Sequence, residues 1–183
     1  MRNGVRPAGA AAALLLLGCA AAPARAADLG TLDCVVTTLD PAVRKEIETD
    51  TARNLAESGH RPSYAATVGS GIGTAAAECA RTHGWSPTAV RAASIFALAK
   101  LRLPIAQRVV SERGFDPAVL EDAFQALPDD VRSRPLTATE TQALVRSVVT
   151  DEAQQTRENA ELLAEFFAFL NSVQYASIAF ANA

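Results

Sequence analysis

Two five-residue segments with the same order of residue types most constrain how this chain can fold. Residues 83–87 read His-Gly-Trp-Ser-Pro, and residues 113–117 read Arg-Gly-Phe-Asp-Pro. A glycine after the last turn of a helix can end it in a left-handed backbone conformation, and the apolar residue that follows packs back onto the helix. A Ser or Asp cap followed by proline then begins the next helix. Both segments therefore predict tight corners between consecutive helices.

The residues outside these corners favour helices as well. Ala, Leu, Glu, Gln and Arg dominate, and these are good helix formers. Asp40 followed by Pro41 marks the start of a helix. A shorter helix that carries Cys34 precedes it. Pro104 is expected to kink or restart the central helix. Further helices are predicted over three segments: about 41–57, 89–101 and 117–126.

The C-terminal part begins with a capping box at residues 137–140 and contains neither Gly nor Pro afterwards. Two apolar stripes follow at helical spacing and in phase. Polar residues lie between them, so residues 138–183 form either one long helix or two helices with a break near Thr150 and Asp151. The first stripe comprises Leu144, Val145, Val148 and Val149, and the second comprises Leu162, Leu163, Phe166, Phe169, Leu170 and Val173. We expect Phe166, Phe167, Phe169 and Leu170 to supply much of the aromatic core.

These patterns predict an all-α fold, a compact bundle of about six or seven helices with a long C-terminal helix or helix pair. Cys34 and Cys79 lie after residues 1–26, which have the pattern of an export signal. Two cysteines in an oxidising compartment outside the cytoplasm favour a disulfide. Such a bridge would tie the N-terminal segment to the helix that enters the Trp85 corner.

The N-terminus has the three parts of a secretory signal peptide. Arg2 and Arg6 form a basic start, residues 8–17 are apolar, and residues 24–26 read Ala-Arg-Ala. The apolar run is too short to span a bilayer, which needs about 20 residues. We therefore expect residues 1–26 to be removed after Ala26, leaving residues 27–183 as a single all-α domain, periplasmic or secreted, without a transmembrane helix.

A second reading of the same segment concerns Cys19. Residues 16–19 read Leu-Leu-Gly-Cys, which resembles the lipobox of bacterial lipoproteins, although Leu17 stands where a small or β-branched residue is usual. Cleavage before Cys19 and its lipidation would anchor the protein to the envelope. Cys19 is therefore the alternative lipidation site.

Composition argues against several kinds of chemistry. The chain has two histidines and a net charge of −3, which disfavours multi-histidine metal sites and nucleic-acid binding. Cys79 and His83 share a helix face and could together bind a metal. Cys79, however, is needed for the disulfide. Residues 69–73 (Gly-Ser-Gly-Ile-Gly) match no nucleotide-binding motif, and we expect a mobile connector or close helix packing there. No metal, cofactor or catalytic residue is predicted.

The polar residues between the two C-terminal stripes are the candidate binding site. In one continuous helix, Glu152, Gln155 and Asn159 would face a partner or a polar pocket. The carboxylates Glu158 and Glu161, with Glu165, flank the apolar stripe and are expected to form a solvated helix edge.

The leading hypothesis is a non-enzymatic interaction module that binds an envelope protein. The alternative is a carrier of a small apolar or lipid-like ligand within the bundle. The third is a carboxylate-based hydrolase, which would need Glu152 or a neighbouring carboxylate in a cleft with a raised pKa.

Overall fold

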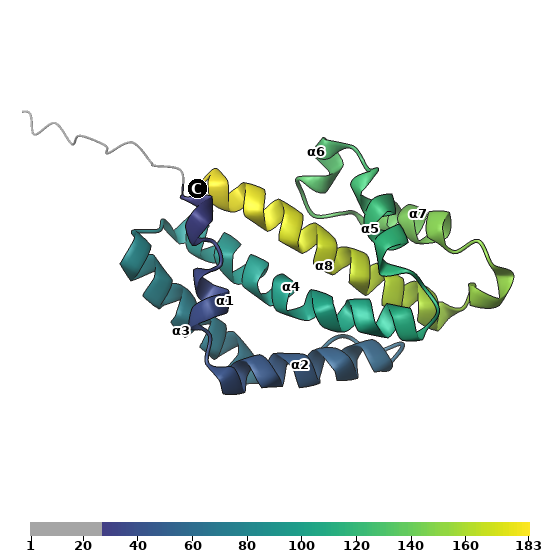
Figure 1. Ribbon diagram of the computed structural model, residues 1–183, viewed down its shortest axis with the longest axis horizontal. Coiled ribbons are helices and arrows are strands. Elements are labelled where there is room, and N and C mark those ends of the chain that lie inside the picture. Colours follow the sequence, from purple (N-terminus) through teal and green to yellow (C-terminus); the bar gives the residue numbers. More distant parts are fainter. Residues whose placement is uncertain (1–26) are drawn as a thin grey trace, which may run out of the picture.

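The computed structural model describes residues 27–183, which form eight α-helices and two 3₁₀-helices and contain no strand (Figure 1). The all-α prediction is therefore confirmed. The helix count slightly exceeds the expected one because a four-residue helix, α6 (Asp129–Arg132), lies between the helix predicted at 117–126 and the capping box at 137–140. The predicted signal peptide, its cleavage position after Ala26 and the alternative lipidation site Cys19 lie outside the described residues.

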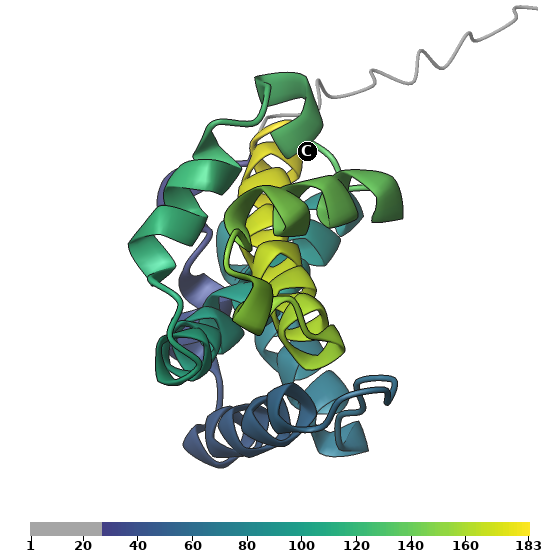
Figure 2. The same ribbon diagram turned by 90° about the vertical axis from the view of Figure 1, so that its right-hand side faces the viewer.

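Two long helices form the spine of the molecule. α4 (Pro87–Glu112) and α8 (Arg157–Ala181) lie side by side and run in opposite directions (Figures 1 and 2). Trp85, just before α4, packs edge-on against Phe180 near the end of α8, with 5.1 Å between ring centroids. By length and composition alone α8 could cross a membrane. Its apolar side, however, is part of the core of this bundle.

The two predicted helix corners are confirmed. Gly84 and Gly114 adopt φ values of +68° and +83°. The amide after each glycine donates to the carbonyl five residues earlier, at 3.2 Å and 3.0 Å respectively. Ser86 then caps α4, and Asp116 caps α5 (Pro117–Gln125). The residue types at the two corners thus predict where α3 and α4 end and where α4 and α5 begin.

The N-terminal helices include one correction. α1 (Cys34–Thr38) and α2 (Pro41–Ala56) follow the prediction. The glycine-rich segment 69–73 does not form a mobile connector, because it lies inside α3 (Ala66–His83). A Cβ added at Gly71 would lie 2.7 Å from Cγ2 of Val43, so the alternative of close packing between small residues holds.

At Pro104 the structure excludes one of the two expected outcomes, a restarted helix. It lies inside α4, and the helix continues past it to Glu112 without restarting. Proline removes one backbone N–H, the donor for the bond to the carbonyl four residues earlier. The Pro104 side chain is exposed, and both halves of α4 pack along α8.

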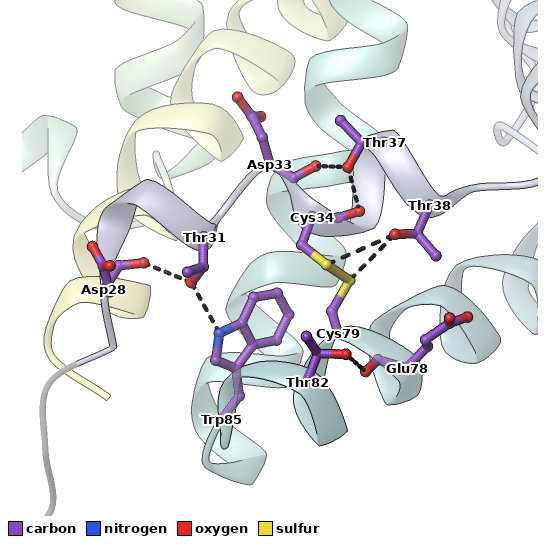
Figure 3. The surroundings of a disulfide bond; sticks show 10 residues. All are labelled: Asp28, Thr31, Asp33, Cys34, Thr37, Thr38, Glu78, Cys79, Thr82 and Trp85. Atoms are coloured by element: carbon purple, nitrogen blue, oxygen red, sulfur yellow. Dashed lines mark hydrogen bonds between the residues drawn. A yellow bond between two sulfur atoms is a disulfide. The ribbon is translucent and has the colours of Figure 1, made fainter.

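The predicted disulfide is confirmed. Cys34 at the start of α1 is bonded to Cys79 in α3, with 5.9 Å between the Cα atoms (Figure 3). Thr38 places its hydroxyl oxygen 3.7 Å and 3.8 Å from the two sulfur atoms. Trp85 donates from Nε1 to the hydroxyl of Thr31 at 3.1 Å (Figure 3). The bridge and this hydrogen bond together attach the N-terminal segment to the α3–α4 corner.

The buried side chains fall into two apolar cores. The first core joins α1, α2, α3, the first half of α4 and the end of α8. The second joins the second half of α4, α5, α7 (Ala138–Val148) and the first half of α8. Phe166, Phe167 and Phe169 are buried in the second core, as expected, with Leu170 partly buried beside them.

Candidate functional site

The polar residues between the C-terminal stripes form a connection and not part of one helix. α7 ends at Val148, a 3₁₀-helix, η2 (Glu152–Gln154), follows, and α8 begins at Arg157. The side chain of Asp151 caps η2 by accepting from the Ala153 amide at 2.9 Å. The structure thus decides between the two alternatives in favour of two helices.

The structure gives the three candidate binding residues different environments. Asn159 is buried, and its side-chain amide donates to the Gln154 carbonyl at 3.0 Å. Its backbone amide donates to the hydroxyl of Thr156 at 3.2 Å. Asn159 therefore holds the connection against the start of α8. Glu152 and Gln155 are exposed, and of these two Gln155 lines a hollow.

This hollow is an open groove between the end of α7 and the first turns of α8. It has a volume of about 460 Å³, and a smaller hollow of about 150 Å³ continues it along the same two helices. We call the two together the α7–α8 groove. Its lining residues are Thr141, Gln142, Val145, Arg146, Val149, Gln154, Gln155, Thr156, Arg157, Ala160 and Ala164.

The floor of the α7–α8 groove is apolar. Val145 of α7 and Val149, which directly follows α7, keep 8% of their surface exposed. Ala160 and Ala164 come from α8, and their small side chains leave the space that larger residues would fill. The valines belong to the stripe that sequence reasoning assigned to the core. Periodicity identified the correct face, but it could not show that the small residues of α8 leave a hollow over these nearly buried valines.

A second hollow lies on the other side of Arg157. It has a volume of about 440 Å³, and the segment 57–62 covers it from the end of α2. Glu161 holds this segment by accepting from the Gly59 amide at 2.7 Å and from Nε of Arg157 at 2.7 Å. We call it the charged hollow, because its lining includes His60, Arg61, Arg113, Arg157, Glu57, Glu158, Glu161 and Glu165.

The expected solvated helix edge is the wall of the charged hollow. Glu158, Glu161 and Glu165 all line it, because the segment 57–62 folds over that face of α8. The hydrogen bonds from Arg157 and Gly59 lower the pKa of Glu161. Burial raises the pKa of Glu165, against the opposing charge of Arg102. Two carboxyls with opposite pKa shifts can act as an acid and a base, although here they lie one turn apart on one helix.

Arg102 is a functional candidate that sequence reasoning missed. Its Cζ atom lies 3.8 Å from the ring centroid of Phe169 and 5.0 Å from that of Tyr64. Its guanidinium lies 3.6 Å from Glu165. Burial lowers the pKa of Arg102. An arginine inside a strongly apolar helix segment is the signal that could have identified it.

Three buried polar side-chain atoms lack a partner within residues 27–183, one of them on Arg102 and one on the neighbouring Tyr64. Arg102 Nε, the Tyr64 hydroxyl and the Thr51 hydroxyl are buried and have no hydrogen-bond partner among the described residues. Thr51 lies on α2 between Ile47 of the first core and Leu55 of the second. The boundary between the two cores is therefore polar.

The two histidines and Cys79 occupy structural or exposed positions. His83 is exposed and stacks on Trp85 with 5.6 Å between ring centroids. Cys79 is in the disulfide, so the pair of Cys79 and His83 is not available to a metal. His60 is exposed, and its Nδ1 lies 3.0 Å from the Ser58 carbonyl oxygen. Within residues 27–183, no three His, Cys, Asp or Glu side chains gather into a metal-binding group.

Comparisons with known proteins give no family for this chain. No protein-family model matches it, and neither a curated protein nor a solved structure matches it. Its function is therefore argued from the residues and their geometry.

Proposed function

We propose that this protein is an exported, non-enzymatic interaction module that binds another envelope protein through the α7–α8 groove. One observation carries the proposal: an open, mostly apolar groove lies at the surface of the helical bundle. Concave apolar surface that water can reach is typical of binding sites. Export is proposed from the signal-peptide pattern of residues 1–26.

Hydrogen bonds within the chain hold the walls of the groove. Asn159 ties the connection to α8 through the Gln154 carbonyl, and the capping box of Thr137 and Glu140 fixes the start of α7. A preformed site loses less conformational entropy on binding than a flexible one. In this proposal Gln155, from the candidate set, contacts the partner directly, whereas Asn159 positions the wall.

Site-specific photocrosslinking in cells that produce the protein tests the proposal. A photoreactive residue replaces Gln142 or Gln155, which line the groove. In control variants it replaces Thr74 or Arg91, which are exposed on α3 and α4. We expect the same discrete crosslinked protein from both groove positions and not from the controls. Identical products from all four positions, or none from the groove, would overturn the proposal.

The two other functions expected from the sequence stay predictions. A carrier would retain an apolar small molecule when the native protein is weighed by mass spectrometry. A carboxylate-based hydrolase would use Glu161 and Glu165, which share the charged hollow.

A further inference from the structure

The charged residues that line the α7–α8 groove are both cationic. They are Arg146, in the last turn of α7, and Arg157, at the first position of α8. None of the lining residues is a carboxylate. The chain as a whole is acidic, with 20 Asp and Glu against 17 Lys and Arg. The groove therefore differs in charge from the average surface of the molecule.

The two arginines differ in whether they already pair with a carboxylate. Arg157 binds Glu161 through Nε at 2.7 Å. Arg146 is exposed and forms no ion pair with any described residue. The positive end of the α8 dipole lies at the same edge of the groove. A ligand above the apolar floor would thus meet the unpaired guanidinium of Arg146 and the N-terminal end of α8 along one side.

The shape of the groove matches a helix. From α7 and its C-terminal cap it presents Thr141, Val145 and Val149, which recur every four residues. From α8 it presents Ala160 and Ala164 with the same spacing. Rows of side chains at this spacing form the ridges and grooves into which another helix packs. The row on α7 covers about two turns, or about 12 Å. The structure presents no strand among residues 27–183 to which a partner strand could pair.

We infer that the occupant of the α7–α8 groove is an amphipathic helix of the partner protein, with Asp or Glu residues beside its apolar stripe. The inference rests on the proposed function and adds the class of partner. Apolar side chains at positions i, i+4 and i+7 of that helix pack over Val145, Val149 and Ala160, as in other helix-in-groove complexes. Its acidic residues pair with Arg146.

Selection from a displayed library of helical peptides tests the inference. The library fixes leucine at i, i+4 and i+7, randomises the other positions, and is selected on the purified protein. We expect Asp and Glu to be enriched beside the leucines. Arg146→Glu is expected to raise the Kd of the selected peptides about tenfold, because attraction at the rim becomes repulsion. Arg91→Glu, an exposed arginine on α4, is the matched control and leaves the Kd unchanged.

A third variant separates failure of the inference from failure of the proposed function. Ala160→Trp fills the groove and is expected to abolish peptide binding. Enriched peptides with neutral or basic flanks that Ala160→Trp still excludes would overturn the acidic-helix inference and keep the groove. If no peptide is enriched, or binding survives Ala160→Trp, both fail. Binding of the protein to phosphatidylglycerol vesicles that Arg146→Glu abolishes, with no peptide enriched, would make the groove a lipid site instead.

Discussion

At the scale of single residues, the contact between Arg102 and Glu165 places two charges where burial disfavours both. The two groups lie 3.6 Å apart, yet burial lowers the pKa of Arg102 and raises that of Glu165. Their mutual attraction opposes each shift without reversing it. Removing a charge from water can cost more than its pairing returns. We therefore expect Glu165 to take up a proton more readily in the folded protein than in the unfolded chain.

Glu165→Gln tests this expectation through the pH dependence of stability. Because the pKa of Glu165 is higher in the folded protein, the folded state binds more protons than the unfolded chain at pH values just above the ordinary Glu pKa. The free energy of unfolding of the wild type then falls as the pH rises through the folded pKa. The variant lacks this loss, so its stability relative to the wild type should increase from about pH 4 to about pH 8. Urea unfolding across that range measures the difference.

The matched control for this prediction is Glu158→Gln. Glu158 is an exposed carboxylate on α8 that also lines the charged hollow, so the control removes the same charge from the same helix. Other carboxyls, such as Glu161 with its lowered pKa, contribute equally to both curves and cancel. A difference between Glu165→Gln and wild type that stays constant, or declines with pH, would contradict the raised pKa.

At the scale of helices, the crossing of α2 and α3 depends on one of three neighbouring glycines. An added Cβ at Gly71 would lie 2.7 Å from Val43, whereas Gly69 and Gly73 have nothing within 4 Å of such an atom. Gly71→Ala is expected to destabilise the protein by about 1–3 kcal/mol, the usual cost of overpacking. Gly69→Ala and Gly73→Ala should each stabilise it by about 0.5–1 kcal/mol, because alanine favours the helix interior. Thermal or urea unfolding measures all three.

A double variant makes the cause of the Gly71 effect explicit. Val43→Ala removes the two methyl groups that an added Cβ would meet. Gly71→Ala should therefore cost less stability in the Val43→Ala background than in the wild type, and the coupling between the two sites is measurable. Equal costs in the two backgrounds would show that the contact with Val43 does not set the helix spacing.

The helices were predictable where their signals are local, and the errors arose from contacts between distant residues. The caps and glycine corners act within a few residues, so the sequence placed them correctly. The role of Gly71 depends on Val43 in another helix. The glutamates of α8 line a hollow because the segment 57–62 folds over them. The α7–α8 groove likewise depends on Ala160 and Ala164 of α8 lying opposite Val145 of α7, which no periodicity in either helix reveals.

At the scale of the whole molecule, the disulfide links helices of only one of the two cores. It joins α1 to α3, and both helices belong to the first core. α1 has five residues and buries Val35 alone among them, so its own packing holds it weakly. The second core, with α5 and α7, is assembled without the bridge. The two cores share α4 and α8 as continuous helices.

Loss of the bridge should therefore loosen the molecule at one end. We expect the double substitution of Cys34 and Cys79 by alanine to lower the free energy of unfolding by about 2–4 kcal/mol. In native-state hydrogen exchange, amides of α1 and α3 should lose protection, while those of α5 and α7 that open locally keep their wild-type rates. Mass spectrometry of exchanged peptides resolves these helices. Equal acceleration in all four would show that the two cores unfold as one unit, with the bridge stabilising the entire chain. Unchanged α7 rates would mean that the groove keeps its walls without the disulfide, so peptide binding there should survive reduction.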